Sequence, residues 1–190
     1  PCRSFLSDGV YNRLTTNLEL LARAHQHNQM SQIQVTGVSP VGIRVAGGFQ
    51  ILELGVRFSA LDHTLDTRTK ERISGSDAPT DAAELWALMR RPGATTRGGA
   101  SGMDWKECPQ CGAPMRIGAA SRCAHCKALI NSGTYDWVLA EITQLSGLVR
   151  LQPPIRGAEL LDAHESLTIQ GLEDRASAIF WTLIASAYQG

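Results

Sequence analysis

Four cysteines in two closely spaced pairs constrain this chain more than any other feature of its sequence. Cys108 and Cys111 form the first pair, Cys123 and Cys126 form the second, and eleven residues separate the two pairs. Each C-x-x-C turn directs two thiolates at one point, so two such turns supply the four corners of a tetrahedral Zn²⁺ site. Because all four ligands are cysteines, no coordination position stays open for a substrate. The pattern therefore predicts a structural zinc ribbon rather than a catalytic metal site.

Two alternatives to a zinc site made of four cysteines stay open. The four cysteines could instead pair as disulfides, whereas zinc binding implies reduced thiols, as in a cytosolic compartment. His125 lies inside the second pair and could replace a cysteine as a ligand, although with four cysteines present we expect it to be exposed. Cys2 is the fifth cysteine. We expect it to be a small buried apolar residue, since nothing adjacent marks it as reactive.

The bulk composition is that of an ordinary globular chain. Its 190 residues are 43% hydrophobic and 6% aromatic, and 18 basic residues balance 18 acidic ones. A general nucleic-acid binder would show a basic excess, so the balanced charge argues against that partner class. No apolar run is long enough for a transmembrane helix, and no secretory signal is visible. Because the chain opens at Pro1 without an initiator methionine, we expect it to be a piece of something longer, whose remainder could contain a membrane anchor.

Residues 5–28 are expected to form a helix. Apolar residues recur there at intervals of three and four, which is the helical period. Ser7 or Asp8 can cap the start by accepting a hydrogen bond from an otherwise unpaired backbone N–H. His25 and His27 fall at the end of this predicted helix, where the helix dipole favours a protonated imidazole over a metal-ligating one.

From residue 31 to 91 the period of apolar residues changes to two, which predicts strands. Gly47-Gly48 lies between two alternating runs and indicates a hairpin, because both glycines can adopt positive φ. A further strand is expected over residues 83–90, with Trp86 and Leu88 on one face. One helix followed by a run of antiparallel strands indicates an α+β domain.

The remaining composition divides the chain into five segments. The small-residue stretch before the cysteines is typical of a linker, and the residues after them carry apolar side chains that we interpret as a short helix. The predicted segments are an α+β domain over residues 1–92, a Gly-rich linker over 93–103, the zinc ribbon over 104–131, a short helix within 132–150 and a helical segment over 155–190.

The last segment carries an apolar stripe at helical spacing. Such a stripe needs a partner surface to bury it. The residues of the stripe are Ala176, Ile179, Phe180, Leu183, Ile184 and Ala187.

The sequence contains no catalytic constellation that we recognise. His63 next to Asp62 resembles a catalytic pair only in composition, because adjacent residues on a strand point to opposite faces. The Gly-Gly pairs at 47–48 and 98–99 are not followed by a helix-opening pattern with lysine, so they do not predict phosphate loops. We therefore do not expect an enzyme.

Several short motifs stand in one order along about residues 3–147. They are Phe5-Leu6-Ser7-Asp8-Gly9-Val10-Tyr11-Asn12-Arg13-Leu14, Val56-Arg57-Phe58-Ser59-Ala60, Ser74-Gly75-Ser76, Glu84-Leu85-Trp86, Arg90-Arg91-Pro92-Gly93, residues 105–114 and residues 132–139. Together they resemble a known family: bacterial proteins related to the C-terminal domain of the membrane-tethering subunit of the mitochondrial import motor (the forty-four-kilodalton translocase subunit). Some bacterial members carry a zinc ribbon after that domain, and the cysteine segment is the most specific part of the resemblance.

The resemblance implies a cone-shaped α+β domain, similar to nuclear transport factor two, in which a curved antiparallel sheet has helices against its concave side. An apolar pocket would lie between them and would suit a lipid tail or an apolar peptide. The same residues could instead fill a dry core. The expected wall residues are Leu14, Leu18, Val45, Leu54, Val56, Phe58, Trp86 and Leu88.

The chain departs from the family at its start. The family domain normally begins with a helix upstream of Phe5-Leu6-Ser7, and this chain lacks it, whereas residues 172–190 resemble that helix. Either the parent protein holds tandem copies, or the C-terminal helix docks in the vacant place, in the same chain or in a neighbouring one.

The resemblance also implies a function. Family members are non-enzymatic and associate with membranes or partner proteins, which implies a bacterial protein at the cytoplasmic side of the inner membrane. We therefore expect a non-catalytic binding or tethering module with a lipid or protein partner and a structural Zn²⁺. An assembly subunit or scaffold that pairs through its C-terminal helix is the alternative. A pocket enzyme of the same fold superclass is a more remote one.

Overall fold

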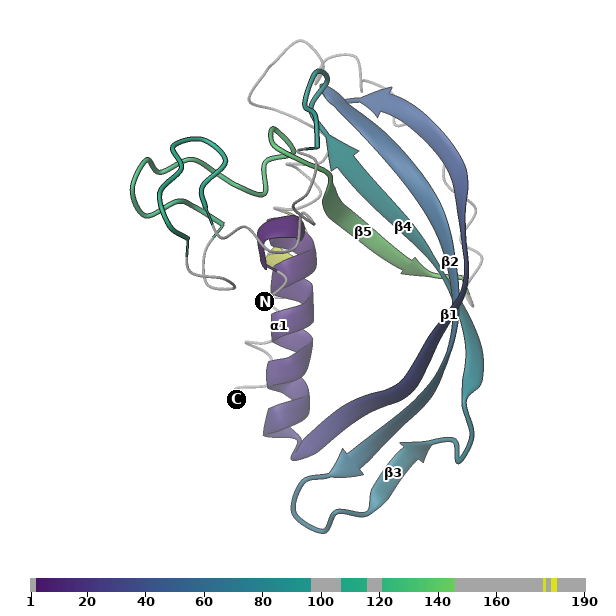
Figure 1. The fold of residues 1–190 in the computed structure, drawn as a ribbon. Helices are drawn as coiled ribbons and strands as arrows, with labels where there is room; N and C mark the ends of the chain where they lie inside the picture. The colour runs from purple at the N-terminus through teal and green to yellow at the C-terminus, as the bar shows by residue number, and fades with distance from the viewer. Residues whose placement is uncertain (1–2, 97–106, 116–120, 146–175, 177–178, 181–190) are drawn as a thin grey trace.

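The computed structural model describes residues 3–96, 107–115, 121–145, 176 and 179–180. These residues form an α+β fold in which one helix packs on a five-stranded antiparallel sheet, as the sequence predicts. Figure 1 shows the sheet curving around the helix, which lies on its concave side. The elements are η1 (Arg3–Phe5), α1 (Asp8–Arg23), β1 (Gln26–Ala46), β2 (Phe49–Asp66), β3 (Arg72–Gly75), β4 (Thr80–Arg90) and β5 (Val138–Gln144).

The start of α1 confirms the predicted cap. Ser7 is almost fully buried and has extended backbone angles, and its hydroxyl oxygen accepts a hydrogen bond from the backbone N–H of Val10 at 3.2 Å. The backbone N–H of Ser7 donates to the carbonyl of Leu139 at 2.9 Å. The first turn of the helix is therefore attached directly to β5.

Replacing Ser7 by alanine is expected to lower the free energy of unfolding by about 1 kcal/mol, because the first turn loses its side-chain acceptor. Urea denaturation of the two proteins would measure the difference. Ser39→Ala, at an exposed position on β1, is the matched control and should stay within about 0.5 kcal/mol. Equal losses for the two variants would show that the cap contributes nothing.

The predicted end of the helix is wrong. The helix ends at Arg23 rather than near residue 28, because His25 adopts a left-handed φ of 55° and the chain turns there into β1. The carbonyl of His25 accepts from the backbone N–H of Thr67 at 2.7 Å, so the turn is held to the far end of β2. His27 consequently lies in a strand and has no place at a helix terminus.

The long hairpin of β1 and β2 confirms the predicted Gly-Gly turn. Gly47 and Gly48 have φ values of 56° and 71°, which strongly favour glycine. The strands pair from Ala46 with Phe49 down to Gln26 with Asp66, and the register shifts at three places along β1. Each such irregularity bends the bulged strand and increases its twist, which contributes to the curvature of the sheet.

The short helix predicted within 132–150 is wrong, because residues 138–144 form β5. This strand pairs antiparallel with β4. Val138 packs on one face of the sheet and Leu139 on the other, so successive side chains are both buried and the apolar run lacks the alternation of a half-exposed strand. Because β5 follows the cysteines in the chain and pairs with β4, which precedes them, the cysteine segment is an insertion between two adjacent strands. An α+β domain that ended at residue 92, as predicted, would leave out one strand of the sheet.

Two clusters of buried side chains cover the two faces of the sheet at the β4–β5 end. We call the face that carries Trp86 and Leu88 the inner face, because these residues pack with α1, and the opposite face the outer face. The alternation predicted for β4 is confirmed. The inner cluster comprises Leu6, Val10 and Leu139 with Phe5, Tyr11, Trp86, Leu88 and Ile142. The outer cluster comprises Phe49, Ile51, Met89, Val138 and Ala140 with Ala46 and Ala87.

Several predictions fall largely outside the described residues. Cys2 and most of the linker 93–103 lie there, and of the segment 155–190 only Ala176, Ile179 and Phe180 are described; these three are helical. No described helix has both the length and the apolar content that a membrane span requires.

Candidate functional site

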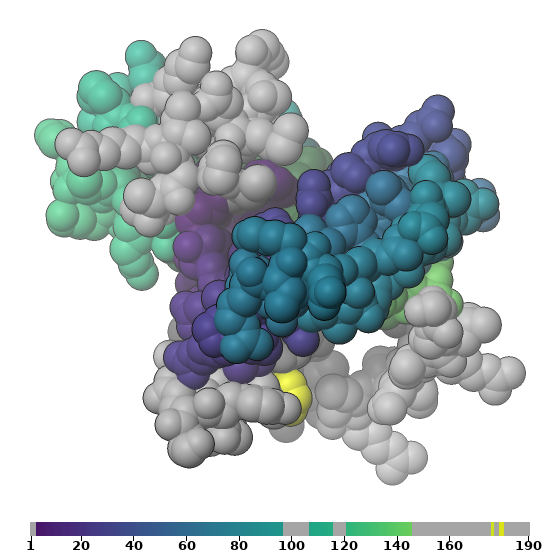
Figure 2. Space-filling view, turned by 90° about the horizontal axis from the view of Figure 1, so that it is seen from below, coloured from purple at the N-terminus to yellow at the C-terminus, as the bar shows by residue number. Residues whose placement is uncertain are grey.

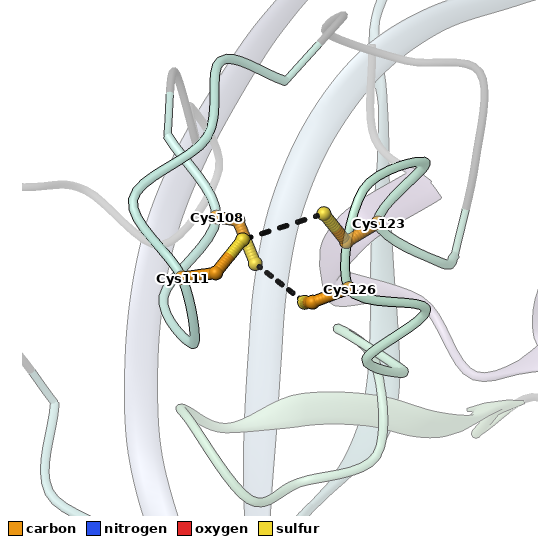
Figure 3. Close-up of side chains that lie close together, drawn as sticks. All are labelled: Cys108, Cys111, Cys123 and Cys126. Atoms are coloured by element: carbon orange, nitrogen blue, oxygen red, sulfur yellow. Dashed lines mark hydrogen bonds between the residues drawn. The ribbon is translucent and has the colours of Figure 1, made fainter.

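The four cysteines converge on one point, as the spacing predicts. Figure 3 shows all four sulfur atoms directed toward a common centre. The Sγ atoms of Cys108 and Cys126 are 3.7 Å apart, those of Cys111 and Cys123 are 3.9 Å apart, and all four lie within 4.8 Å of one another. A tetrahedron with Zn–S bonds of ~2.3 Å has S–S edges of ~3.8 Å. The donor set therefore fits a zinc-type ion.

The same distances argue against disulfides. A disulfide bond is about 2.05 Å long, and all four cysteines are free thiols. Cys108 and Cys123 are buried, while Cys111 and Cys126 are exposed. His125 is exposed, as expected, and stands outside the four-residue group. The coarse prediction of a four-cysteine candidate metal site is thus confirmed.

The two pairs adopt the same backbone turn. In the first, the N–H of Gly112 donates to the carbonyl of Cys108 at 2.9 Å; in the second, the N–H of Lys127 donates to the carbonyl of Cys123 at 3.0 Å. Gly112 and Lys127 both have positive φ, 73° and 63°. Only the first turn has the glycine that this conformation favours, so the second turn tolerates strain at Lys127 in order to direct its thiols inward.

The thiols influence one another strongly. Hydrogen bonds from the backbone N–H groups of Cys126 and His125 lower the pKa of Cys123 to about 6. At Cys126 the backbone N–H of Ala128 acts in the same direction, but the partial loss of water around the sulfur and the hydrogen bonds with the other three cysteines outweigh it and raise the pKa to about 12. Four thiolates this close repel one another, and a bound cation would remove that repulsion.

A buried asparagine attaches the cysteine segment to the helix. Asn131 is 4% exposed, and its Nδ2 donates to the carbonyl of Leu6 and to Oδ1 of Asp8, both at 2.9 Å. Although burial acts to raise the pKa of Asp8, hydrogen bonds from Arg3 and Asn131 lower it overall. The preceding residue, Ile130, packs against Cys108 and Cys123. Sequence reasoning missed Asn131, because nothing local distinguishes it from an exposed loop residue.

Two further contacts hold this segment in place. The phenolic hydroxyl of Tyr135 donates to Oε1 of Gln110, which lies between the first two cysteines, at 2.9 Å. The backbone N–H of Arg91, after β4, donates to the carbonyl of Gly133 at 2.8 Å. Figures 1 and 2 both place the cysteine segment on the side of α1 that is away from β1 and β2.

The eight predicted pocket residues do not share one environment. Five of them lie on the inner face of β2 and β4, where Leu54 pairs with Trp86. Val56 is buried, and Leu54, Phe58, Trp86 and Leu88 are half-buried. Leu14, Leu18 and Val45 are exposed. Their role as ligand contacts stays a prediction.

Exposed apolar side chains lie on α1 and on the inner side of β1. Leu14 and Leu18 follow the buried Val10 at intervals of four residues, which keeps them on the side of the helix that faces the sheet. On β1, the inner residues pair with Phe58, Val56, Leu52 and Gln50 of β2. We call this set the inner surface; its members are Leu14, Leu18, Val35, Val38, Ile43 and Val45, which are between 40% and 72% exposed.

Comparison with known protein families finds no model that matches the chain, and comparison with curated proteins finds none that matches it either. The described structure defines the class of protein: one helix on an open five-stranded antiparallel sheet, with a four-cysteine cluster as a candidate metal site. The resemblance to import-motor tethering proteins stays a prediction.

Proposed function

We propose that this protein is a non-catalytic binding module that holds an apolar segment of its partner against the inner surface and uses a structural Zn²⁺ to organise its cysteine insertion. The main observation behind this proposal is that Leu18 on α1 and Ile43 and Val45 on the inner side of β1 are each more than 60% exposed. Single exposed apolar residues are common on protein surfaces, but a group of them on one concave face is typical of an interaction site.

The role of zinc rests on the donor set and its surroundings. Cysteine thiolates prefer zinc-type ions, and four of them complete a tetrahedral site without an open position. The contacts of Ile130 and Asn131 connect this site to the start of α1. We therefore assign Zn²⁺ a structural role, in which it orders the insertion between β4 and β5 and takes no part in any chemistry.

The tethering role and the bacterial inner-membrane location come from the family resemblance, and we propose them on that basis. A lipid tail and a peptide both offer the apolar surface that the inner surface would contact. Assembly into a larger complex is the second candidate function, and the exposed apolar side chains of the edge strand β1 favour it.

Binding of an apolar ligand can be measured directly. A fluorescent long-chain fatty acid and vesicles of phosphatidylcholine with phosphatidylglycerol are suitable probes. Ile43→Asp is expected to weaken binding by about tenfold or more, because the carboxylate would lose its water against an apolar ligand. Ser39→Asp is the matched control, since Ser39 pairs with Gly55 and lies on the outer side of the same strand. Equal binding by the two variants would exclude the inner surface as the binding site.

A further inference from the structure

The two edge strands of the sheet, β5 and β1, differ in what pairs with them. At β5 the chain's own start takes up part of the edge: Leu6 forms a parallel bridge with Leu139, and the backbone N–H of Ser7 donates to the carbonyl of Leu139 at 2.9 Å. At the other edge, β1 pairs with β2 on one side only. None of its 21 residues is buried. Within the part of the chain that the structure describes, no backbone group bonds to its free edge.

This free edge has little of the protection that edge strands usually carry. An open edge can pair with another strand, and proteins commonly prevent this with short strands, lysines or inward-pointing charges. β1 is long and contains no lysine and no acidic residue. Its one arginine, Arg44, lies on the outer side and forms an ion pair with Glu53 at 3.3 Å. A second strand would therefore meet no unpaired ionic group along β1.

The irregularities of β1 permit pairing with one strand in particular, which is a second copy of β1. The register shifts against β2 lie between residues 31 and 34, between 35 and 37 and between 40 and 42. These positions are nearly symmetric about the point between residues 36 and 37. If an antiparallel copy is placed with its own midpoint there, each irregular stretch lies opposite an irregular stretch, and regular stretches lie opposite regular ones.

The same register matches the two sides of the strand. Val35 and Val38 both lie on the inner side and would come opposite each other. Met30 would come opposite Ile43, and its partner on β2, Asp62, lies on the inner side by the alternation of the strand. Opposite residues of an antiparallel pair must lie on the same face of the sheet. β1 satisfies this condition with itself despite its three irregularities.

We propose that two copies of this chain join through β1, antiparallel, with Val35 of each copy opposite Val38 of the other. The two sheets then form one continuous sheet with both inner sides on the same face. Arg44 comes opposite Gln29 rather than a second Arg44, so like charges do not meet. Because a twofold axis relates the copies and each uses the same edge, the assembly closes at two chains. This inference goes beyond the proposed function and requires no ligand.

The mass of the full chain in solution tests the pairing, and light scattering or sedimentation would measure it. The wild-type protein is expected to have twice the mass of one chain. In Val35→Lys/Val38→Lys each new ammonium group would face another across the twofold axis, so the dissociation constant should rise about thirtyfold or more. Both side chains are exposed in the single chain, at 60% and 58%, so this variant should keep the wild-type circular dichroism.

Leu18→Lys/Ile73→Lys is the matched control. It replaces two exposed apolar residues by the same two charges, on α1 and β3 instead of β1, and is expected to remain a dimer. A monomeric wild-type protein, or a Val35→Lys/Val38→Lys variant with wild-type affinity, would overturn the proposal. Equal weakening in the control would also overturn it, because the loss would then come from net charge rather than from the edge of β1.

Disulfide trapping tests the register. Val35→Cys and Val38→Cys, each in a Cys2→Ser background with zinc bound, are mixed and mildly oxidised. The mixture is expected to form a disulfide between chains, located by peptide mass spectrometry. Either variant alone should form far less, because its two new thiols would be displaced by about 7–10 Å along the strands, outside the range of a disulfide. No bond in the mixture, or equal bonding by one variant alone, would overturn the register.

Ligand binding separates this inference from the proposed function. Leu18→Lys/Ile73→Lys alters the inner surface, so it should bind the fluorescent fatty acid more weakly than the wild type while it stays a dimer. A wild-type monomer that binds the fatty acid would overturn the pairing and support the proposed function. A wild-type dimer with the expected disulfide, which binds neither fatty acid nor vesicles, would support the pairing and exclude lipid as the ligand.

Discussion

Replacing Cys123 by serine is expected to abolish stoichiometric zinc binding and to lower the thermal midpoint of the whole chain, not only to disorder the cysteine segment. Structural zinc sites contribute about 10–16 kcal/mol of apparent binding free energy in small peptides. A segment this short has little core of its own, so it should lose its fold with the metal.

The effect should extend to the sheet through Asn131. Without an ordered segment, its two hydrogen bonds to Leu6 and Asp8 would be lost, at a cost of about 2–4 kcal/mol because one acceptor is charged. For a chain of this size that corresponds to about 5–15 °C. Mass spectrometry for zinc and a thermal melt followed by circular dichroism would measure the two quantities.

His125→Ala is the control for this prediction, because His125 is exposed and outside the cluster. It should retain one zinc per chain and the wild-type midpoint. If Cys123→Ser keeps its zinc, the candidate site is not the metal site. If it loses zinc but melts at the wild-type temperature, the cysteine segment does not stabilise the sheet.

Replacing Leu139 by alanine is expected to lower the free energy of unfolding by about 2–5 kcal/mol. Leu139 is 3% exposed and packs with Leu6 and Val10 between β5 and the start of α1. The truncation leaves a cavity at the point where the helix is attached to the sheet. Chemical denaturation followed by tryptophan fluorescence would measure the loss.

Leu145→Ala supplies the matched comparison. The same atoms are removed just beyond the end of β5, where the side chain is 39% exposed, so the loss should stay below about 1 kcal/mol. Similar losses at the two positions would show that β5 is not part of the core.

Local patterns predicted the parts of the fold that depend on neighbouring residues. The cap at Ser7, the turn at Gly47-Gly48 and the two faces of β4 follow from hydrogen bonds and periods that extend over a few residues. The end of α1 did not follow, because His25 turns the chain where its carbonyl meets Thr67, which lies far along the sequence. Residues 138–144 were predicted as part of a helix because a short apolar run has no period that distinguishes a helix from a strand. Pairing with β4, which is distant in the sequence, makes these residues a strand.

In the candidate metal site, too, the sequence predicted the local features and missed a contact between distant residues. Its four ligands could be recognised because each C-x-x-C turn places two thiols by local geometry alone. The contact between Asn131 and Leu6 joins positions 125 residues apart, and no local signal points to it. The resemblance to import-motor proteins adds expectations about the binding partner that the fatty-acid and vesicle measurements can test.

The sequence by itself determined the cysteine cluster, because the spacing of the ligands is a local property that any surrounding fold would preserve. Only the tertiary structure decided whether the side chains of the inner surface are covered or exposed. Val35, Val38, Ile43 and Val45 alternate in the same way whether they are covered or not, and exposure depends on how far α1 lies from β1. That position is determined by the attachment of the helix to β5 and the cysteine insertion at one end and to the β2–β3 turn at the other.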